Sequence, residues 1–198
     1  SILDYLLGGQ DTIAPEKGIF LDRTFRLHPK INSFISESFY DGRLLTDEIT
    51  SQRKIDFSGN GLIKSEGIHF IAMDHEERSQ TCLEEYKVIE KLMKQLVGAK
   101  FTYKDKVRKL DLSDFLIISP YNAQVNYLLS RLEKGTKCGT IDKFQGQEAP
   151  ITIISMTSSD TENLPRQKSF FFNRNRLNVA ISRSQCASII LFNPKLLD

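Results

Sequence analysis

The sequence lacks several features that would assign it to a class of protein directly. Its three cysteines are odd in number and widely spaced, without a Cys-x-x-Cys pair, which argues against a disulfide framework and is typical of a reducing compartment. The histidines show no metal-ligand spacing with these cysteines, so we predict no structural zinc. No apolar run approaches the ~20 residues that span a bilayer, and no charged-then-apolar signal segment opens the chain. We therefore expect a soluble protein of the cytoplasm.

A second absence concerns nucleotide binding. The sequence contains no Gly-x-x-x-x-Gly-Lys-[Ser/Thr] loop, which is the usual cradle for a triphosphate, and no Gly-Lys dipeptide at all. Residues 68–77 resemble a strand that delivers a carboxylate to magnesium, but such a carboxylate has no substrate without the phosphate loop. Gly59-Asn-Gly61 lacks the third glycine of a dinucleotide fingerprint and predicts only a turn.

The residues that are present predict one domain, 1–198, with a substantial core. The chain is 40% hydrophobic and 26% charged, with a net charge of only +2, which is ordinary for a soluble domain. Apolar runs predict buried strands over 19–21, 68–73, 115–119, 151–156 and 188–192. Helical stripes of apolar residues lie between them, over 31–39, 88–96 and 125–132. This alternation predicts the α/β class, with a parallel sheet flanked by helices.

Two segments interrupt the alternation, and we predict loops or insertions there. The first, 46–66, contains Gly59 and Gly61 among mixed charges. The second, 98–111, contains five basic residues close together. A further basic region follows, because 163–197 contains no Asp or Glu. We expect that region to be a local source of positive potential.

Arginines in two segments could contact phosphate. Arg176 and Arg183 lie seven positions apart, so on a helix they would project in nearly the same direction, toward one cleft. Planar guanidiniums suit phosphate oxygens, although surface arginines often simply pair with carboxylates; the lack of acids nearby weakens that alternative. Arg26 lies just before Pro29, which is suited to open a helix. It would lie at a sheet edge, where it could equally satisfy hydrogen bonds at the helix entry.

Two further segments are polar. Residues 119–124 fall between a predicted strand and a predicted helix, at the carboxyl edge where open α/β sheets bind ligands. In 139–148, Gly139 and Gly146 allow close backbone approach, Thr140 offers a phosphate contact, and Glu148 can accept from a ribose hydroxyl. By composition alone, this second segment is equally consistent with an ordinary polar loop.

Taken in order, these segments resemble the second, C-terminal RecA-like domain of superfamily 1 helicases, in the class of the nonsense-mediated-decay RNA helicase and the Dna-type nuclease–helicases. The resemblance covers nearly the whole chain. It rests on four ordered motifs: Thr24-Phe-Arg-Leu-His-Pro29, Pro120-Tyr-Asn-Ala-Gln124, Thr140-Ile-Asp-Lys-Phe-Gln-Gly-Gln-Glu148 and Arg176-Leu-Asn-Val-Ala-Ile-Ser-Arg183. Residues 1–8 and 14–23 look closest to bacterial fusions of a RecB-like nuclease with such a helicase.

The resemblance implies a role for each matching residue. Two catalytic arginines would reach the γ-phosphate of ATP across an interdomain cleft: Arg26 and Arg183. Three residues would bind other parts of the nucleotide or sense its state: Phe25, Gln145 and Glu148. Four would line the path of a single strand: Pro120, Tyr121, Asn122 and Thr140. Two would support these groups: Gly146 and Arg176. No metal ligand is implied.

The resemblance also implies that the chain is a fragment of an ATP-dependent helicase or translocase. ATP with Mg²⁺ would be held mainly by a first RecA-like domain in the same parent chain, and a nuclease domain is a possible fusion partner. Single-stranded nucleic acid would be the track, DNA rather than RNA, with 5′-to-3′ movement. We expect the isolated chain to bind ATP weakly and to have no turnover.

Two alternatives remain open. One is a stand-alone nucleic-acid-binding or scaffold module without ATPase activity; Arg26, Arg183 and Glu148 argue against it, because all three are present where a nucleotide would need them. The other is a flavodoxin-like interaction domain, for which the order of the four motifs would be a coincidence.

Overall fold

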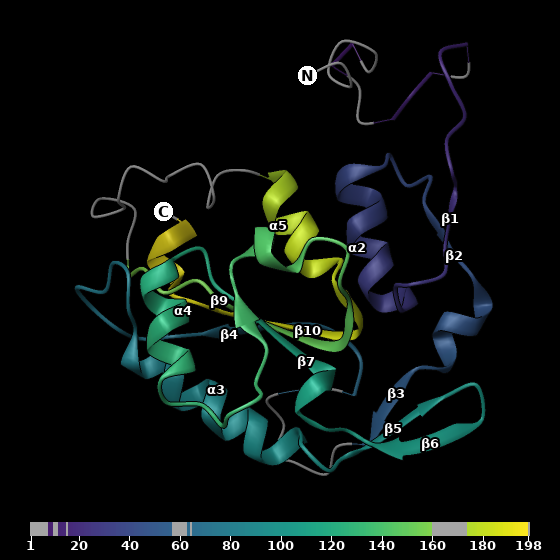
Figure 1. The fold of residues 1–198 in the computed structure, drawn as a ribbon. Helices are drawn as coiled ribbons and strands as arrows, with labels where there is room; N and C mark the ends of the chain where they lie inside the picture. The colour runs from purple at the N-terminus through teal and green to yellow at the C-terminus, as the bar shows by residue number, and fades with distance from the viewer. Residues whose placement is uncertain are drawn as a thin grey trace.

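The structure is a computed structural model, and it describes residues 8–9, 12–14, 16–56, 63, 65–159 and 174–197 (Figure 1). Its elements are, in chain order, β1 (Arg23–Thr24), α2 (Pro29–Phe39), β2 (Leu45–Thr46), η1 (Glu48–Gln52), β3 (Lys54–Asp56), β4 (Gly67–Ala72), α3 (Leu83–Leu96), β5 (Lys100–Tyr103), β6 (Lys106–Lys109), η2 (Leu112–Asp114), β7 (Phe115–Ile118), α4 (Asn122–Leu129), β8 (Cys138–Gly139), η3 (Ile141–Phe144), β9 (Ala149–Ser155), α5 (Arg174–Ile181), β10 (Ser184–Phe192) and η4 (Pro194–Leu197).

Five parallel strands form the main sheet, in the order β4-β10-β9-β7-β8. β10 pairs with β4 on one side and with β9 on the other, and β7 joins β9 to β8. The side chains of β7 and β9 are buried on both faces, which suits their β-branched and apolar composition. Figure 1 shows helices covering both sides of this sheet. The α/β, RecA-like fold predicted from the sequence is confirmed.

The two faces of the sheet build two separate cores. Neighbouring residues of β9 illustrate the division: Ile153 packs with α3 and α4, whereas Ile154 packs with α2 and α5. This follows from the two-residue period of a strand, which sends successive side chains to opposite faces. The stripes predicted over 31–39, 88–96 and 125–132 correspond to α2, α3 and α4 and supply the helical sides of these cores.

Four of the five predicted strands are present, as β4, β7, β9 and β10. The prediction for 19–21 is wrong: no strand forms there, and Ile19 and Leu21 are 90% and 81% exposed. Three apolar residues are too few to show a period, so the pattern could not separate a buried strand from an exposed extended segment. The first strand of the described residues, β1, begins two positions later and pairs only with β2.

The described parts of the two segments predicted to be loops or insertions contain regular strands. β3, from the first, and β5 and β6, from the second, form a separate antiparallel sheet in the order β3-β5-β6. Ile55 and Phe101 point inward and are buried, while charged residues alternate with them. The turn between β5 and β6 is tight, because Lys104 and Asp105 both have positive φ, 51° and 58°. The predicted turn at Gly59 and Gly61 lies outside the described residues.

The described part of the chain also bears on membrane-spanning helices and on the cysteines. None of its helices is both long enough and apolar enough to cross a membrane. The three cysteines are free and buried; Cys138 and Cys186 pack in the core, whereas Cys82 caps α3 by accepting from the Glu85 N–H.

Candidate functional site

The predicted catalytic residues meet at the amino ends of two adjacent strands. Glu148 immediately precedes β9 and Arg183 immediately precedes β10; the Ala149 N–H donates to the Arg183 carbonyl over 3.1 Å. The segment that contains Arg26 joins the same edge, since the His28 N–H donates to the Gln185 carbonyl, also over 3.1 Å. Backbone pairing therefore brings three distant parts of the sequence together.

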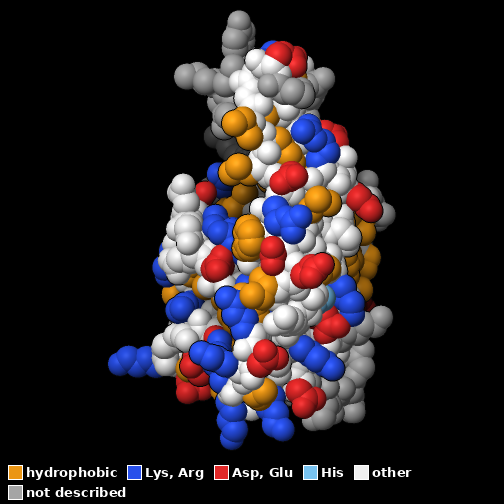
Figure 2. Space-filling model, turned by 90° about the vertical axis from the view of Figure 1, so that its right-hand side faces the viewer, with side chains coloured by type: hydrophobic (Ala, Val, Ile, Leu, Met, Phe, Trp, Pro, Cys, Tyr) orange, Lys and Arg blue, Asp and Glu red, His pale blue; other side chains and the backbone are white. Residues whose placement is uncertain are grey.

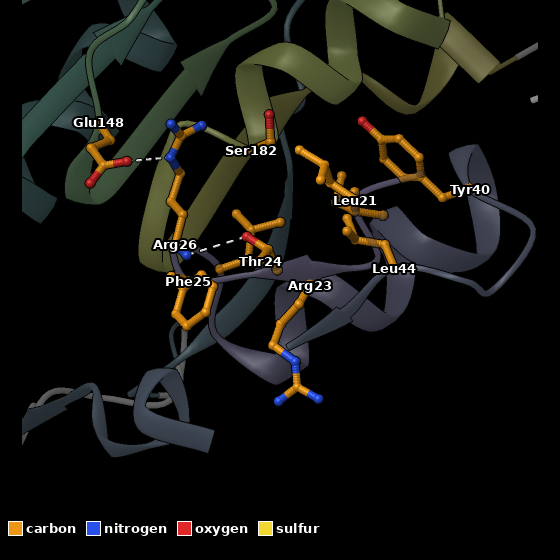
Figure 3. Close-up of a pocket in the computed structure, with 11 residues that line it drawn as sticks. Leu21, Arg23, Thr24, Phe25, Arg26, Tyr40, Leu44, Glu148 and Ser182 are labelled. Atoms are coloured by element: carbon orange, nitrogen blue, oxygen red, sulfur yellow. Dashed lines mark hydrogen bonds and ion pairs between the residues drawn. The ribbon is translucent and has the colours of Figure 1, made fainter. Parts of the chain in front are cut away.

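Side-chain contacts at this edge centre on Glu148. Its carboxylate accepts a hydrogen bond from Arg26 Nε on one side and from Gln185 Nε2, at 2.7 Å, on the other (Figure 3). Arg26 and Glu148 remain open to solvent, with side chains 41% and 38% exposed. An ion pair of this exposure is worth at most about 1 kcal/mol, so an incoming anion could separate it.

Arg183 has fewer partners than its charge requires. Its Nε is buried and has no hydrogen-bond partner in the structure, and its Nη1 makes only a long contact of 3.4 Å to the Gln147 carbonyl. Burial lowers the pKa of the Arg183 guanidinium, and the nearby charge of Arg26 lowers it further, while Glu148 opposes both effects. Two mutually repelling guanidiniums thus lie near one carboxylate that pairs directly only with Arg26, an arrangement that fits a multiply charged anion.

A cavity of about 540 Å³ opens beside these residues, and Arg26 and Glu148 line it together with Ser182 (Figure 3). Phe25 lies at its margin with its ring 63% exposed, so a planar ring could stack on it. The hydrogen bond at the entry of α2 is made by His28, whose side chain accepts from the Lys30 N–H. The Arg26 side chain points instead to Glu148.

Three other residues predicted to act with the nucleotide, Gln145, Gly146 and Arg176, do not line the cavity. Gln145 and Gly146 are exposed in the loop after η3, and Gly146 has φ 77°, a conformation that favours glycine. The helix predicted over 176–183 ends at Ile181, so Arg183 lies beyond α5 and is not on the same helix face as Arg176. Arg176 instead forms an ion pair with Asp142 at 3.5 Å. Asp142 lies on η3, 34 positions away in the sequence, so the lack of acids around Arg176 could not predict this pair.

The predicted strand path lies at the opposite, carboxyl edge of the sheet, and its one aromatic residue is turned inward. Tyr121 is only 5% exposed, and its hydroxyl contacts Ser158 Oγ at 3.0 Å. Asn122 is exposed, whereas Pro120 and Thr140 are partly exposed. Tyr121 therefore could not stack on a base without leaving its buried position.

Sequence reasoning missed the buried polar network beneath Tyr121. Glu85, on α3, is fully buried and accepts from the Thr157 N–H at 3.0 and 3.1 Å and from Ser155 Oγ. Burial raises the pKa of the Glu85 carboxyl. Ligand-type atoms of His75, Cys82 and Glu85 lie within 4.8 Å of one another, a proximity that their spacing in the sequence did not predict. An acidic residue in the first turn of a helix is ordinary, so nothing in the sequence marked Glu85 as different.

Arg53 was missed as well, because it falls in a predicted loop. It is 5% exposed, and its guanidinium donates to the carbonyls of Arg26 and Phe25, the second at 3.1 Å. The same guanidinium lies 4.5 Å from the centre of the Tyr103 ring on β5. Arg53 thus links the small antiparallel sheet to the backbone that presents the cavity residues.

Comparison with known proteins decides the family. Residues 3–195 match the family described as AAA domain. The chain belongs to this family. It is 30% identical over 197 residues, 92% of the chain, to an uncharacterized ATP-dependent helicase of Methanocaldococcus jannaschii. It is 29% identical to a DNA polymerase alpha-associated DNA helicase A of Saccharomyces cerevisiae over 90% of the chain, and 29% identical to a regulator of nonsense transcripts 1 homolog of Arabidopsis thaliana over 92%.

This AAA domain is therefore of the superfamily 1 helicase kind, as the four motifs indicated; two of the three relatives are named helicases, and one of these names includes ATP dependence. The matched region is a small part of each relative. The chain spans 28%, 28% and 15% of the length of these three proteins, in the order given.

Proposed function

We propose that this AAA domain acts as the arginine-donating, C-terminal motor domain of an ATP-dependent helicase or translocase. The observation that supports this most directly is the pair Arg26 and Arg183. Arg26 lines the open cavity and pairs with the Glu148 carboxylate, while Arg183 lies close enough to feel both charges and its Nε has no partner in the structure. A triphosphate presented by another domain would supply the missing negative charge.

The residues of the cleft suit this task. ATP, with Mg²⁺, would be held mainly by a first RecA-like domain, and this chain would close on it from the other side. Arg26 and Arg183 would bind oxygens of the γ-phosphate and stabilise the charge that develops on it during hydrolysis. Glu148 would release Arg26 and turn to the ribose, a change that costs little because their ion pair is exposed.

Nucleic acid would be the track along which the parent protein moves. Asn122, with Pro120 and Thr140 beside it, offers the exposed polar edge that a strand could follow. DNA preference, 5′-to-3′ movement, a fused nuclease and a cytoplasmic location stay predictions. The relatives' names do not favour DNA uniformly, since one is a DNA helicase and another a regulator of nonsense transcripts.

Nucleic-acid-stimulated ATPase activity of the protein that contains this chain tests the proposal. Arg26→Ala and Arg183→Ala should each lower kcat by about 10³-fold or more, the effect of a missing arginine in related phosphoryl transfer. Arg131→Ala is the matched control, because Arg131 is an exposed arginine on a different part of the surface. Unchanged activity in both cleft variants would contradict the proposal.

The alternative, a binding module without a motor, makes a different prediction. The coding sequence upstream of the chain should contain a phosphate loop and a paired Asp-Glu after an apolar strand if the motor proposal is right. A start codon in their place would favour the binding module, and the isolated chain would then bind nucleic acid without any effect of ATP.

A further inference from the structure

The small antiparallel sheet concentrates positive charge. Its strands and the hairpin turn, 54–56 and 100–109, contain six basic and two acidic side chains, a net charge of +4, whereas the whole chain has +2. Figure 2 views the side of the molecule that carries β6 in Figure 1, and Lys and Arg side chains project at its lower end. The rest of the chain must therefore be slightly acidic on balance.

Strand register divides these charges between two faces. Lys100 lies directly opposite Lys109 on β6, and Lys54 lies opposite Thr102. Directly opposed residues share a face, and the period of two puts Lys54, Lys100 and Lys109 together on one side. The inward face contains the buried Ile55 and Phe101. The outward face of this sheet, which we call the lysine face, is therefore open to solvent.

The lysine face has a charge arrangement that folding alone does not favour. No ion pair joins Lys54, Lys100 or Lys109 to any carboxylate of the described residues, and Asp56 is the only acid on the face. Like charges directly opposite each other, as Lys100 and Lys109 are, destabilise a sheet. By contrast Arg108, on the inward side, forms two hydrogen bonds of 2.6 Å with Asp114 and contributes to holding the hairpin in place.

We propose that the lysine face binds the phosphate backbone of nucleic acid, as a contact separate from the strand path at the carboxyl edge. The proposal rests on the proposed function, which supplies a polyanion as the track. The aromatic side chains of β5, Phe101 and Tyr103, belong to the inward side, so no ring is available on the lysine face for stacking on bases. Proteins that select single strands use such rings. The lysine face should thus contact phosphates of duplex and single strand alike, without reading sequence.

Rigid support distinguishes this surface from a flexible basic tail. Ile55 and Phe101 anchor the sheet in the core, and Arg53 stacks on Tyr103 from behind. Arg53 also donates to the Phe25 and Arg26 carbonyls, so the lysine face is joined through one side chain to the backbone that holds Arg26. Preorganised lysines lose less freedom when phosphate binds.

Binding of a fluorescent DNA duplex of about 20 base pairs, measured by anisotropy between about 50 and 200 mM salt, tests the proposal. The variant Lys54→Ala, Lys100→Ala, Lys109→Ala should bind the duplex about tenfold more weakly at the low-salt end. The slope of log K against log salt should fall by about 2–3, because each lost phosphate contact removes about 0.9 from it. The control Lys87→Ala, Lys91→Ala, Lys134→Ala removes the same charge from exposed lysines elsewhere and should change both quantities little.

Equal losses in the two triple variants would overturn the proposal, because the effect would then be one of net charge alone. Unchanged duplex binding in the Lys54→Ala, Lys100→Ala, Lys109→Ala variant would also overturn the proposal. That result is expected if the lysine face binds an acidic protein instead of nucleic acid. The Arg26→Ala and Arg183→Ala ATPase test does not involve these lysines, so a failure of the lysine face leaves the proposed motor function standing. Matched circular dichroism and unfolding curves establish that the lysine variants are folded.

Discussion

The two ends of the main sheet differ in how far their charged groups are open to solvent, and each contains a buried nitrogen without a hydrogen-bond partner, Arg183 Nε at one end and His75 Nε2 at the other. At the amino ends of β9 and β10, Arg26 and Arg183 are held near one carboxylate, and one buried nitrogen has no partner in the structure. At the carboxyl end of β9, Glu85 accepts several hydrogen bonds and Tyr121 is tied to Ser158, all with little exposure. The first edge is open and deficient in negative charge, whereas the second is closed.

This difference indicates where a ligand can bind at no cost to the fold. A group added at the amino edge would complete contacts that the structure leaves unfinished. A group added at the carboxyl edge, beneath Tyr121, would have to break contacts that already exist. The general rule that open α/β sheets bind ligands at the carboxyl edge would therefore not describe the nucleotide site proposed for this domain, which lies at the opposite edge.

The largest change in stability is expected from a substitution at the closed carboxyl edge. Glu85→Ala should lower the free energy of unfolding by about 3–5 kcal/mol, because the Thr157 N–H and Ser155 lose a buried partner and His75 loses a charge neighbour. Urea unfolding measures this loss. Glu84→Ala, one position earlier, removes a surface pair with Arg78 and a weak hydrogen bond from Cys82 Sγ, and should cost about 1 kcal/mol or less. Similar losses in the two variants would show that the network contributes no special stability.

Arg53 connects the lysine face to the open edge, and its replacement should have the next largest effect. Arg53→Lys keeps the charge but cannot donate to the Phe25 and Arg26 carbonyls at once, so we expect a loss of about 1–2 kcal/mol in unfolding free energy. Arg131→Lys is the control, since Arg131 also stacks on a tyrosine, Tyr127, but is exposed. Equal changes for both would mean that the stacking, and not the paired backbone contact, determines the effect.

Much of the fold could be predicted from the sequence because the main strands are buried on both faces. Runs such as 151–156 and 188–192 have no alternation, and this is what a parallel sheet flanked by helices requires. The small sheet could not be predicted in the same way. Its strands are only three or four residues long and contain few apolar residues among the lysines of the open face, so the composition is that of a loop.

The candidate site was predictable to a different extent at the two edges. Arg26, Glu148 and Arg183 were named from motifs, and backbone pairing of three segments brings them together. Tyr121 was named by the same reasoning, yet it is buried, because a motif does not say toward which side a residue points. Partners such as Ser158 and Asp142 are distant in sequence and follow only from the tertiary structure.

At the open edge, removing the shared carboxylate should change binding more than stability. Glu148→Gln leaves both guanidiniums without their counter-charge, so inorganic tripolyphosphate should bind about five-fold more tightly, a gain of ~1 kcal/mol typical of one exposed charge. Calorimetry at low salt measures the affinity, and the free energy of unfolding should change by less than about 1 kcal/mol. Glu133→Gln removes an exposed acid elsewhere and should leave the affinity unchanged. An unchanged affinity for Glu148→Gln would mean that this carboxylate does not restrain the arginines.

The smallest effect compares two neighbouring carboxyls, one outside the closed network and one inside it. Hydrogen bonds from Arg78 lower the pKa of Glu84 to about 2, whereas burial raises the pKa of Glu85. A lowered pKa stabilises the fold above the ordinary value of 4.5, and this contribution disappears as the pH falls from there toward 2. Glu85 has the opposite sign, since a raised pKa makes the folded state hold its proton more tightly as the pH falls.

Unfolding curves of the original chain and of Glu84→Gln, recorded at a series of pH values from 5 downward, separate these contributions. The original chain should lose more stability on acidification than Glu84→Gln. The difference should stay below about 1 kcal/mol, because the side chains of Glu84 and Arg78 are 33% and 40% exposed to solvent. It should shrink further in high salt, which screens exposed pairs but not buried ones. If the two proteins lose stability equally, the pair between Glu84 and Arg78 is not formed in solution. Strong pairing of carboxylates in this region would then be confined to the buried network around Glu85.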